Sequence, residues 1–297
     1  MFDLAVTLPA VVASAACAGA YSSSDFFRKS VPGAVSPALA LFYAFGLEAP
    51  VLALWLALSG DTHIDAGYIL PGAAVAVLGL AANVLFMIAL RRSPISLMVP
   101  LLALVPVFTA IAGGLLLGEW PSAQQAFGII AVALGLFLLY VPATGGFHPI
   151  LVWRSFASQA GAKPMMGVVL LWSLSPPADK LCLAHSGVGL HGLIQLFILA
   201  GATGLWLLVQ GGVSAFTLPK GAAKPLVGVA FTAGIGYGLQ LAAYQMTLVA
   251  LVELIKRVVG LVGALIFGRA YFQEPITGPK LTGMAVIALG LPLVLLG

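Results

Sequence analysis

The residue that most directly indicates chemistry in this sequence is Glu48, a carboxylic acid in the middle of a long apolar run. Its surroundings read FYAFGLEAPVLALW, so a membrane helix formed by that run would carry Glu48 near its centre. A charged side chain there costs about 3 kcal/mol on insertion scales, so Glu48 must face the protein interior, pair with a cation or be protonated. Two interpretations stay open: a protonatable or cation-attracting group in a solute pathway, and a neutral acid hydrogen-bonded to a neighbouring helix.

Five ionisable residues form a second candidate group. Glu253, Lys256 and Arg257 have i, i+3 and i+4 spacing, which places them on one face of a helix. Asp179 and Lys180 end another apolar run, and we expect that end at the same membrane face. The five groups would act as a gate whose ion pairs break and reform, or would bind a substrate carboxylate or phosphate. The alternative is a neutral network that anchors two helices, with long side chains reaching the interface.

Two matching polar runs, YSSSDFFRK from Tyr21 and WSLSPPADK from Trp172, indicate a third group. The pair Pro176-Pro177 cannot continue the backbone hydrogen bonds of a helix, and serine hydroxyls can bond to the groups it frees. We predict interruptions in both helices, because such interruptions at corresponding repeat positions mark binding sites in transporters. The side chains that would line this site are Tyr21, Ser22, Ser24, Trp172, Ser173 and Ser175. The alternative is that each serine bonds only to a carbonyl of its own helix.

Other polar side chains fall at mid-span positions of apolar runs. Gln240 and Tyr244 are four residues apart and share a helix face. The predicted substrate-binding set is Glu48, Tyr21, Ser24, Tyr43, Asn83, Trp172, Ser175, Tyr237, Gln240 and Tyr244. Gln195 and His191 are weaker candidates. His191 lies near the start of its apolar run, so we expect it at the membrane interface.

Motifs for other chemistry are missing from the sequence. It contains no GxxxxGK[ST] phosphate loop, no HExxH and no DxxD pair on a loop. Cys17 and Cys182 lack CxxC or Cys/His metal spacing and are read as small apolar residues. We therefore predict no catalytic residue, no cofactor and no metal. ATP-driven transport by this chain alone is not expected, which leaves coupling to a proton gradient or plain exchange.

Composition restricts the chain to the membrane class. It is 61% hydrophobic and 7% charged, with a mean hydropathy of +1.12. A crossing needs about 20 apolar residues, so the chain is filled by spans almost from end to end. Its net charge of +4 comes from scattered Lys and Arg, which is no footprint for nucleic acid. The expected partners are the lipid bilayer and a small-molecule substrate, and monomer or homo-oligomer stays open.

Ten apolar runs bounded by polar, Gly and Pro residues predict an all-α protein with ten membrane helices. These runs cover residues 4–26, 37–58, 68–90, 95–117, 124–141, 165–183, 189–209, 225–247, 250–272 and 279–296. The connections are short, apart from the loop between the two halves and the stretch around Lys220–Lys224, and none is large enough for a soluble catalytic domain.

The two halves of the chain repeat each other. Ser22 matches Ser173 and Ser24 matches Ser175 at one constant offset, and FGIIAVALGLFLL from Phe127 resembles TGMAVIALGLPLV from Thr282. We divide the chain into a five-helix repeat over 1–145, a loop over 146–163 and a second five-helix repeat over 164–297. Because each repeat has an odd number of spans, the repeats should be inverted, with a solute site between them. The Gly-rich, uncharged fifth span of each repeat is expected at the periphery of the central cavity.

Basic residues predict the orientation. Ten of the thirteen Lys and Arg fall in the connections that lie on one side of the ten-span arrangement. The positive-inside rule makes that side cytoplasmic, so both termini should lie outside.

The sequence resembles the drug/metabolite transporter superfamily, specifically its ten-span EamA-type branch, over nearly the whole chain. The most specific stretch runs from Leu90 to Tyr140, with a Pro106-Val107-Phe108 step, a helix-ending Gly118-Glu119 and a Gly-rich fifth span. The resemblance implies a multi-pass protein of the bacterial cytoplasmic (inner) membrane that exports amino acids, other metabolites, drugs or nucleotide conjugates. Many members keep their termini cytoplasmic, which is opposite to the charge count here.

The leading hypothesis is a secondary transporter that exports a small polar metabolite, such as an amino acid or organic ion, by alternating access. Within transport, the alternatives are a multidrug or organic-cation exporter and a lipid-conjugate flippase. The alternative from another class is an integral-membrane enzyme or a structural membrane subunit.

Overall fold

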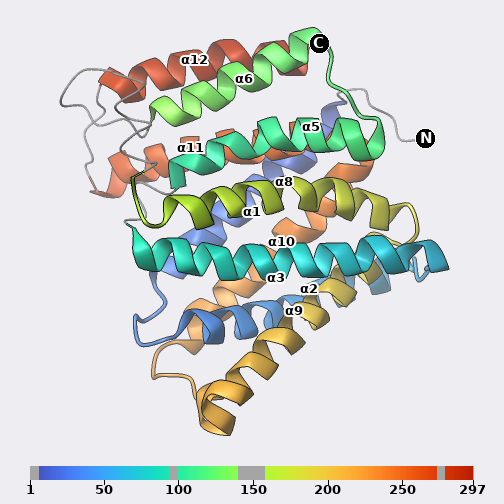
Figure 1. The fold of residues 1–297 in the computed structure, drawn as a ribbon, viewed down its shortest axis with the longest axis vertical. Helices are drawn as coiled ribbons and strands as arrows, with labels where there is room; N and C mark the ends of the chain where they lie inside the picture. Colours follow the sequence, from blue (N-terminus) through green and yellow to red (C-terminus); the bar gives the residue numbers. More distant parts are fainter. Residues whose placement is uncertain (1–6, 94–98, 140–157, 273–277, 297) are drawn as a thin grey trace. The chain divides into compact units, whose positions relative to one another are not determined.

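The computed structural model describes residues 7–93, 99–139, 158–272 and 278–296, and these residues form helices joined by short connections (Figure 1). The α-helices are α1 (Leu8–Lys29), α2 (Pro37–Ser59), α3 (Ile69–Arg92), α5 (Val105–Leu117), α6 (Ala123–Leu138), α8 (Ala162–Leu183), α9 (Val188–Gly211), α10 (Ala223–Met246), α11 (Val249–Phe272) and α12 (Gly278–Leu295). Three 3-10 helices extend them: η1 (Ala66–Tyr68), η2 (Val99–Leu104) and η3 (Gly212–Phe216). Most of the predicted loop 146–163 lies outside the described residues.

Each of these α-helices overlaps one of the ten ranges predicted from the sequence, so the all-helical class is confirmed. Within the described residues, five helical segments are long and apolar enough to cross a membrane. They cover Pro37–Ser59, Ala66–Ala89, Val188–Phe216, Ala223–Met246 and Gly278–Leu295. The chain is therefore a multi-pass membrane protein, while the count of ten crossings stays a prediction.

Local signals set the helix ends. Ser36 accepts a hydrogen bond from the backbone N–H of Leu39 and Pro37 takes the first position of α2, which together start that helix. Ser122 and Gln125 form a capping box at the start of α6. Gly118 ends α5 with a φ of 72°, a left-handed conformation that a residue with a Cβ rarely adopts.

The described chain divides into two compact units that do not coincide with the sequence repeats. Unit 1 contains residues 1–11, 81–177 and 246–297, and unit 2 contains residues 12–80 and 178–245. Unit 2 thus holds nearly all of α1 and α10 and the whole of α2 and α9, and unit 1 holds α5, α6, α11 and α12. The boundary between the units divides α3 after residue 80 and α8 after Pro177.

In unit 1, α6 and α12 pack side by side through glycines (Figure 1). A Cβ placed on Gly128 would lie 2.7 Å from the carbonyl oxygen of Gly290. A Cβ on Gly135 would lie 2.8 Å from the carbonyl oxygen of Gly283. Because the later glycine of one helix meets the earlier glycine of the other, α6 and α12 run antiparallel. The missing side chains let the two backbones approach closely, as is common between membrane helices.

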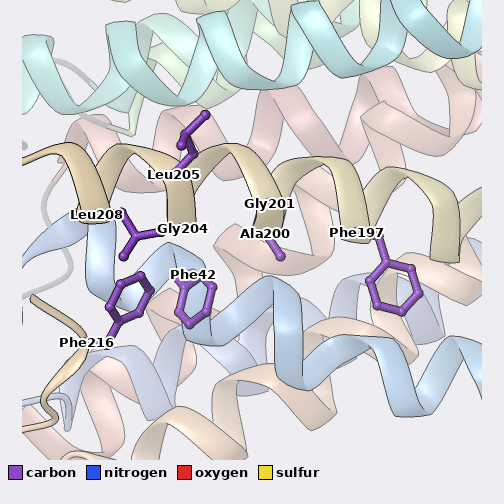
Figure 2. Close-up of a pocket in the computed structure, with 8 residues that line it drawn as sticks. All are labelled: Phe42, Phe197, Ala200, Gly201, Gly204, Leu205, Leu208 and Phe216. Carbon is purple, nitrogen blue, oxygen red and sulfur yellow. The ribbon is translucent and has the colours of Figure 1, made fainter. Parts of the chain in front are cut away.

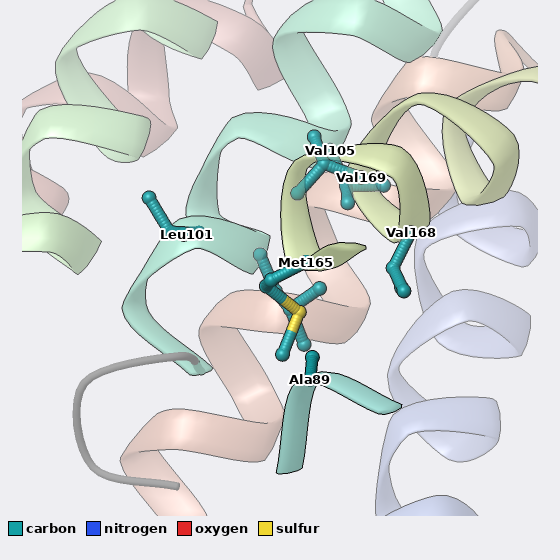
Figure 3. Close-up of a cluster of buried hydrophobic side chains, with 7 residues drawn as sticks. Ala89, Leu101, Val105, Met165, Val168 and Val169 are labelled. Atoms are coloured by element: carbon teal, nitrogen blue, oxygen red, sulfur yellow. The ribbon is translucent and has the colours of Figure 1, made fainter. Parts of the chain in front are cut away.

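A cluster of buried apolar side chains joins α3, η2, α5 and α8 in unit 1 (Figure 3). Its buried members are Ala89, Leu101, Leu102, Val105, Met165, Val168 and Val169. Trp172 packs against the edge of this cluster, with its ring centroid 5.2 Å from that of Phe86. The cluster therefore fixes the part of α8 that was predicted to line a binding site.

The predicted interruptions of the helices that contain Tyr21 and Trp172 are wrong. α1 continues through its serine run, and α8 continues through Pro176 and Pro177. A proline removes one backbone hydrogen bond, and a helix supported on its sides by neighbouring helices tolerates that loss. The prolines and serines of these two runs therefore do not interrupt either helix.

Candidate functional site

Glu48 is buried within unit 2, with 6% of its surface exposed. Within the described part of the chain its carboxyl forms no hydrogen bond and no ion pair, although the charge of Arg28 acts on it electrostatically. Such a group lacks the compensation that burial of a carboxyl ordinarily requires, since buried polar groups are usually hydrogen-bonded. A buried, unpartnered carboxyl is a candidate to bind a cationic group or a proton.

Two glycines of α10 let that helix pack closely against α1 and α2 near Glu48. A Cβ on Gly234 would lie 3.0 Å from Val51 Cβ and 3.3 Å from the carbonyl oxygen of Glu48. Two residues further along α10, a Cβ on Gly236 would lie 3.2 Å from the ring of Tyr21. Three helices of unit 2 thus meet around Glu48 and Tyr21, two residues of the predicted substrate-binding set.

The two units share out the predicted residues. Unit 2 holds Glu48, Tyr21, Ser24, Tyr43, Tyr237, Gln240, Tyr244, Asp179 and Lys180. Unit 1 holds Asn83, Trp172, Ser175, Glu253, Lys256 and Arg257. Most of the predicted substrate-binding residues therefore belong to unit 2. Within unit 2, Tyr237 packs beside a cluster formed by Ala49, Leu52 and Leu196. The side chains of Tyr244 and Lys180 are fully buried. The Tyr43 hydroxyl donates a hydrogen bond to the Phe216 carbonyl at 2.8 Å.

The serines of the two polar runs have different partners. Ser22 and Ser175 donate to carbonyls four residues back in their own helices, at 2.9 and 3.0 Å. Ser24 instead donates across to the Val229 carbonyl of α10 at 3.3 Å. Ser173 donates to its own helix at the Val169 carbonyl (2.6 Å) and to the Val105 carbonyl of α5 (3.2 Å). Ser24 and Ser173 therefore join helices.

The ionisable cluster of unit 1 contains one close ion pair. Lys256 Nζ lies 2.6 Å from Glu253 Oε1, and the Glu253 carboxylate is buried. The Nε of Arg257 is buried and has no hydrogen-bond partner among the residues that the structure describes. The predicted helical spacing thus does bring Glu253 and Lys256 together.

Asp179, the other acidic member of that predicted cluster, belongs to unit 2 and contacts residues that the sequence did not connect with it. Its Oδ1 lies 3.1 Å from His191 Nε2. His191 Nδ1 lies 2.9 Å from the Tyr68 hydroxyl, which also accepts from Gln195 Nε2 at 3.2 Å. All four side chains are buried.

The His191 ring is enclosed by protein, and its expected position at the depth of the membrane interface stays a prediction. Sequence reasoning did contain a signal for part of this network. The connection between α8 and α9 is short, so the end of α8 with Asp179 must lie near the start of α9 with His191. No such signal indicated Tyr68.

The connection between α2 and η1 carries an exposed polar cluster. The His185 ring lies 2.9 Å from Asp65 Oδ1, and the backbone N–H of Gly67 donates to the same oxygen at 2.7 Å. The hydrogen bond from His185, helped by that of Gly67, lowers the pKa of the Asp65 carboxyl below its usual value. Within the described chain, no three His, Cys, Asp or Glu side chains gather closely enough to hold a metal ion.

Unit 2 also has an open apolar groove of about 440 Å³, lined by residues of α2, α9 and η3 (Figure 2). Figure 2 shows Phe42 and Phe216 next to each other below α9, with Phe197 further along that helix. Gly201 and Gly204 of α9 leave the space that larger side chains would fill. No residue of the predicted substrate-binding set lines this groove.

Comparisons with known proteins found a match to a family model and a solved structure with the same fold. Residues 8–141 match the sequence model of the EamA-like transporter family. A solved crystal structure of another protein shares the fold with a TM-score of 0.77 at 18% identity, covering 97% of this chain and 96% of that one. No curated protein matches the chain in sequence.

Proposed function

We propose that this multi-pass membrane protein, an EamA-like transporter by its match over residues 8–141, exports a small polar metabolite such as an amino acid or organic ion. Export is secondary active, driven by a proton gradient or by exchange, and access to the solute alternates between the two sides. The cytoplasmic membrane of a bacterium is the proposed location.

The observation that carries this proposal is Glu48. Its carboxyl is buried in α2 and lacks a hydrogen-bonding partner among the described residues, although an acid at that depth is costly to insert. A binding site repays such a cost when the solute itself supplies the missing partner. An ammonium group would do so through a charge-assisted hydrogen bond. Glu48 is therefore assigned to bind the cationic group of the solute.

The arrangement of the chain supports alternating access. α6 and α12 are equivalent helices of the two predicted repeats and run antiparallel, which is the relation expected of inverted repeats. The division into two units passes through α8 at Pro177, where prolines have already removed backbone hydrogen bonds. A helix weakened at that step is suited to bend during a transport cycle.

One observation favours a second candidate, an exporter of drugs, organic cations or lipid conjugates. The groove of unit 2 is lined by apolar side chains, and three phenylalanines contribute to it. An apolar solute part would bind there by burying hydrocarbon. An integral-membrane enzyme or a structural subunit has no such specific observation in its favour.

The test is counterflow in liposomes that contain the purified protein, with a panel of amino acids, amines, lipid conjugates and sugar phosphates. Saturable exchange of an amino acid or another small organic ion supports the proposal. Exchange restricted to hydrophobic cations or lipid conjugates selects the second candidate. Absence of exchange across the panel, in protein shown to be folded by its thermal transition, contradicts the proposed function. Glu48→Gln protein and protein-free liposomes are the controls.

A further inference from the structure

A buried chain of hydrogen bonds in unit 2 connects four side chains from η1, α8 and α9. Gln195 Nε2 donates to the Tyr68 hydroxyl at 3.2 Å and to the Gly72 carbonyl at 3.0 Å. The Tyr68 hydroxyl lies 2.9 Å from His191 Nδ1, and His191 Nε2 lies 3.1 Å from Asp179 Oδ1. Solvent does not reach the His191 ring.

The donors and acceptors fit one direction when Asp179 is ionised and His191 is neutral. His191 Nε2–H donates to Asp179, and Nδ1 accepts the hydrogen of the Tyr68 hydroxyl. Gln195 then uses both of its N–H groups as donors. One polar atom of this hydrogen-bond chain is left over: Gln195 Oε1 is buried and has no hydrogen-bond partner within the described part of the protein.

That orphaned oxygen is unfavourable, since a buried acceptor without a hydrogen bond destabilises a protein. It acquires a use when His191 binds a second proton. An imidazolium donates from both nitrogens, so Tyr68 must then accept from Nδ1 and give its own hydrogen to another acceptor. A half-turn of the Gln195 amide brings Oε1 to the position now held by Nε2, beside the Tyr68 hydroxyl, and breaks the hydrogen bond from Nε2 to the Gly72 carbonyl. The chain can thus reverse and hold one added proton.

Few other titratable groups of the described residues face His191. On α8 these are Asp179 and Cys182, with buried Lys180 next in sequence to Asp179; on η1 there is Tyr68; and on α10, Tyr237 interacts electrostatically with Asp179 and Tyr68. α2 packs against this part of α9 with Leu52 and Leu56, and α3 packs there with Val75 and Leu78. Asp179 is therefore the group whose negative charge directly stabilises an added proton on His191.

We propose that the Asp179–His191–Tyr68–Gln195 chain is the site that binds the coupling proton of this transporter. The inference rests on the proposed function and deepens it by separating two roles. Glu48 binds the solute, and His191 takes up a proton whose binding reverses the hydrogen-bond chain. Imidazole suits this role because its charge changes within the range of ordinary cellular pH.

The first experiment needs no substrate. The full chain, with nitrogen-15 in its four histidines, is placed in lipid nanodiscs, and the ring nitrogens are followed by NMR between about pH 5 and pH 8. A His191→Gln variant identifies the signal of His191. We expect His191 to become doubly protonated within this range. We also expect Gln195→Met to move the midpoint to lower pH, because the acceptor for the reversed chain is gone.

The matched control is Gln210→Met, which changes an exposed glutamine of the same helix and should leave the midpoint where it is. A His191 ring that stays neutral down to pH 5 in folded protein overturns the proposal. A midpoint that Gln195→Met leaves unchanged, or raises, overturns the role of the hydrogen-bond chain.

The second experiment measures coupling in liposomes with a solute that wild-type protein exchanges. In His191→Gln we expect loss of accumulation driven by a pH gradient, while solute exchange without a gradient continues. The control His63→Gln, at an exposed histidine, should retain both. Accumulation that persists in His191→Gln contradicts the proton role, and loss of both activities in folded variant protein assigns His191 to solute passage instead. If wild-type protein exchanges nothing, the proposed function fails while the NMR titration still decides whether the proton site exists.

Discussion

Gly135 of α6 and Gly283 of α12 lie backbone against backbone. A Cβ on Gly135 would lie 2.8 Å from the carbonyl oxygen of Gly283, and a Cβ on Gly283 would lie 2.7 Å from the carbonyl oxygen of Gly135. Gly128 and Gly290 make the same contact two turns away. The repeat relates Gly128 to Gly283 and Gly135 to Gly290, so exchanging the two helices turns each contact into the other. Contacts of this kind arise between equivalent helices related by a two-fold axis.

Gly135→Ala should destabilise the protein by about 1–3 kcal/mol, because the added methyl group meets backbone atoms that cannot move aside easily. Gly19→Ala is the matched control, since a Cβ on that helical glycine of α1 would meet nothing within 4 Å. The control should stabilise by roughly 0.5–1 kcal/mol through helix propensity. Thermal unfolding of both variants in detergent measures the difference. Equal transition temperatures for the two variants would show that the close approach of α6 and α12 does not exist.

The sequence predicted the positions of the helices well and the interactions between distant side chains poorly. Apolar runs between polar connections locate helices because the bilayer requires long uninterrupted apolar segments. The pairing of Glu253 with Lys256 was also predictable, since it depends only on helical spacing. The contact of His191 with Tyr68 joins residues 123 positions apart, and no local pattern encodes it. Pro176 and Pro177 predicted a break that is absent from α8. Their local sequence disfavours a helix, but packing against neighbouring helices supports one there.

The ion pair of Glu253 and Lys256 should make a measurable contribution to stability. Lys256→Met leaves the buried Glu253 carboxylate without its 2.6 Å partner, so we expect a loss of about 2 kcal/mol. A double-mutant cycle with Glu253→Gln isolates the interaction between the two side chains. Asp25 and Arg28 form the control pair, with the same i, i+3 spacing but exposed side chains 3.4 Å apart, and should couple by less than about 0.5 kcal/mol. A coupling of Glu253 with Lys256 no larger than that of the control pair would make the close contact energetically irrelevant.

Asp65 should make stability fall at acid pH. Its folded-state pKa is lowered by the hydrogen bond from His185, so its contribution is present above the pKa of the unfolded chain and is lost as pH falls through the lower, folded-state pKa. Asp65→Asn should therefore unfold at a lower temperature than wild type at pH 7, and the difference should shrink below about pH 4. Because the carboxyl is exposed, the effect should be small and weakened by salt. A difference in unfolding temperature that stays constant from pH 7 to pH 3 would exclude a titrating interaction at Asp65.

We expect the orientation in which the ten Lys and Arg assigned to the predicted basic connections face the cytoplasm. Reporter fusions after Gly297 should be active on the external side, and fusions between α3 and η2 should be active in the cytoplasm. A reporter after Gly297 that works only in the cytoplasm would reverse the orientation and show that the charge count is overruled.

Glu48→Gln should fold as well as wild type, because the amide keeps the shape of the side chain and costs less to bury than a charged carboxylate. It should lose both exchange and gradient-driven transport of a cationic or zwitterionic solute, since the negative partner for the solute is gone. This pattern differs from that of His191→Gln, in which exchange continues. Glu48→Asp is the informative companion, because it keeps the charge on a shorter side chain and should retain part of the exchange. Full transport by Glu48→Gln, at unchanged dependence on pH, would reduce Glu48 to a structural group. The Glu253–Lys256 pair and Arg257 would then be the next site to test.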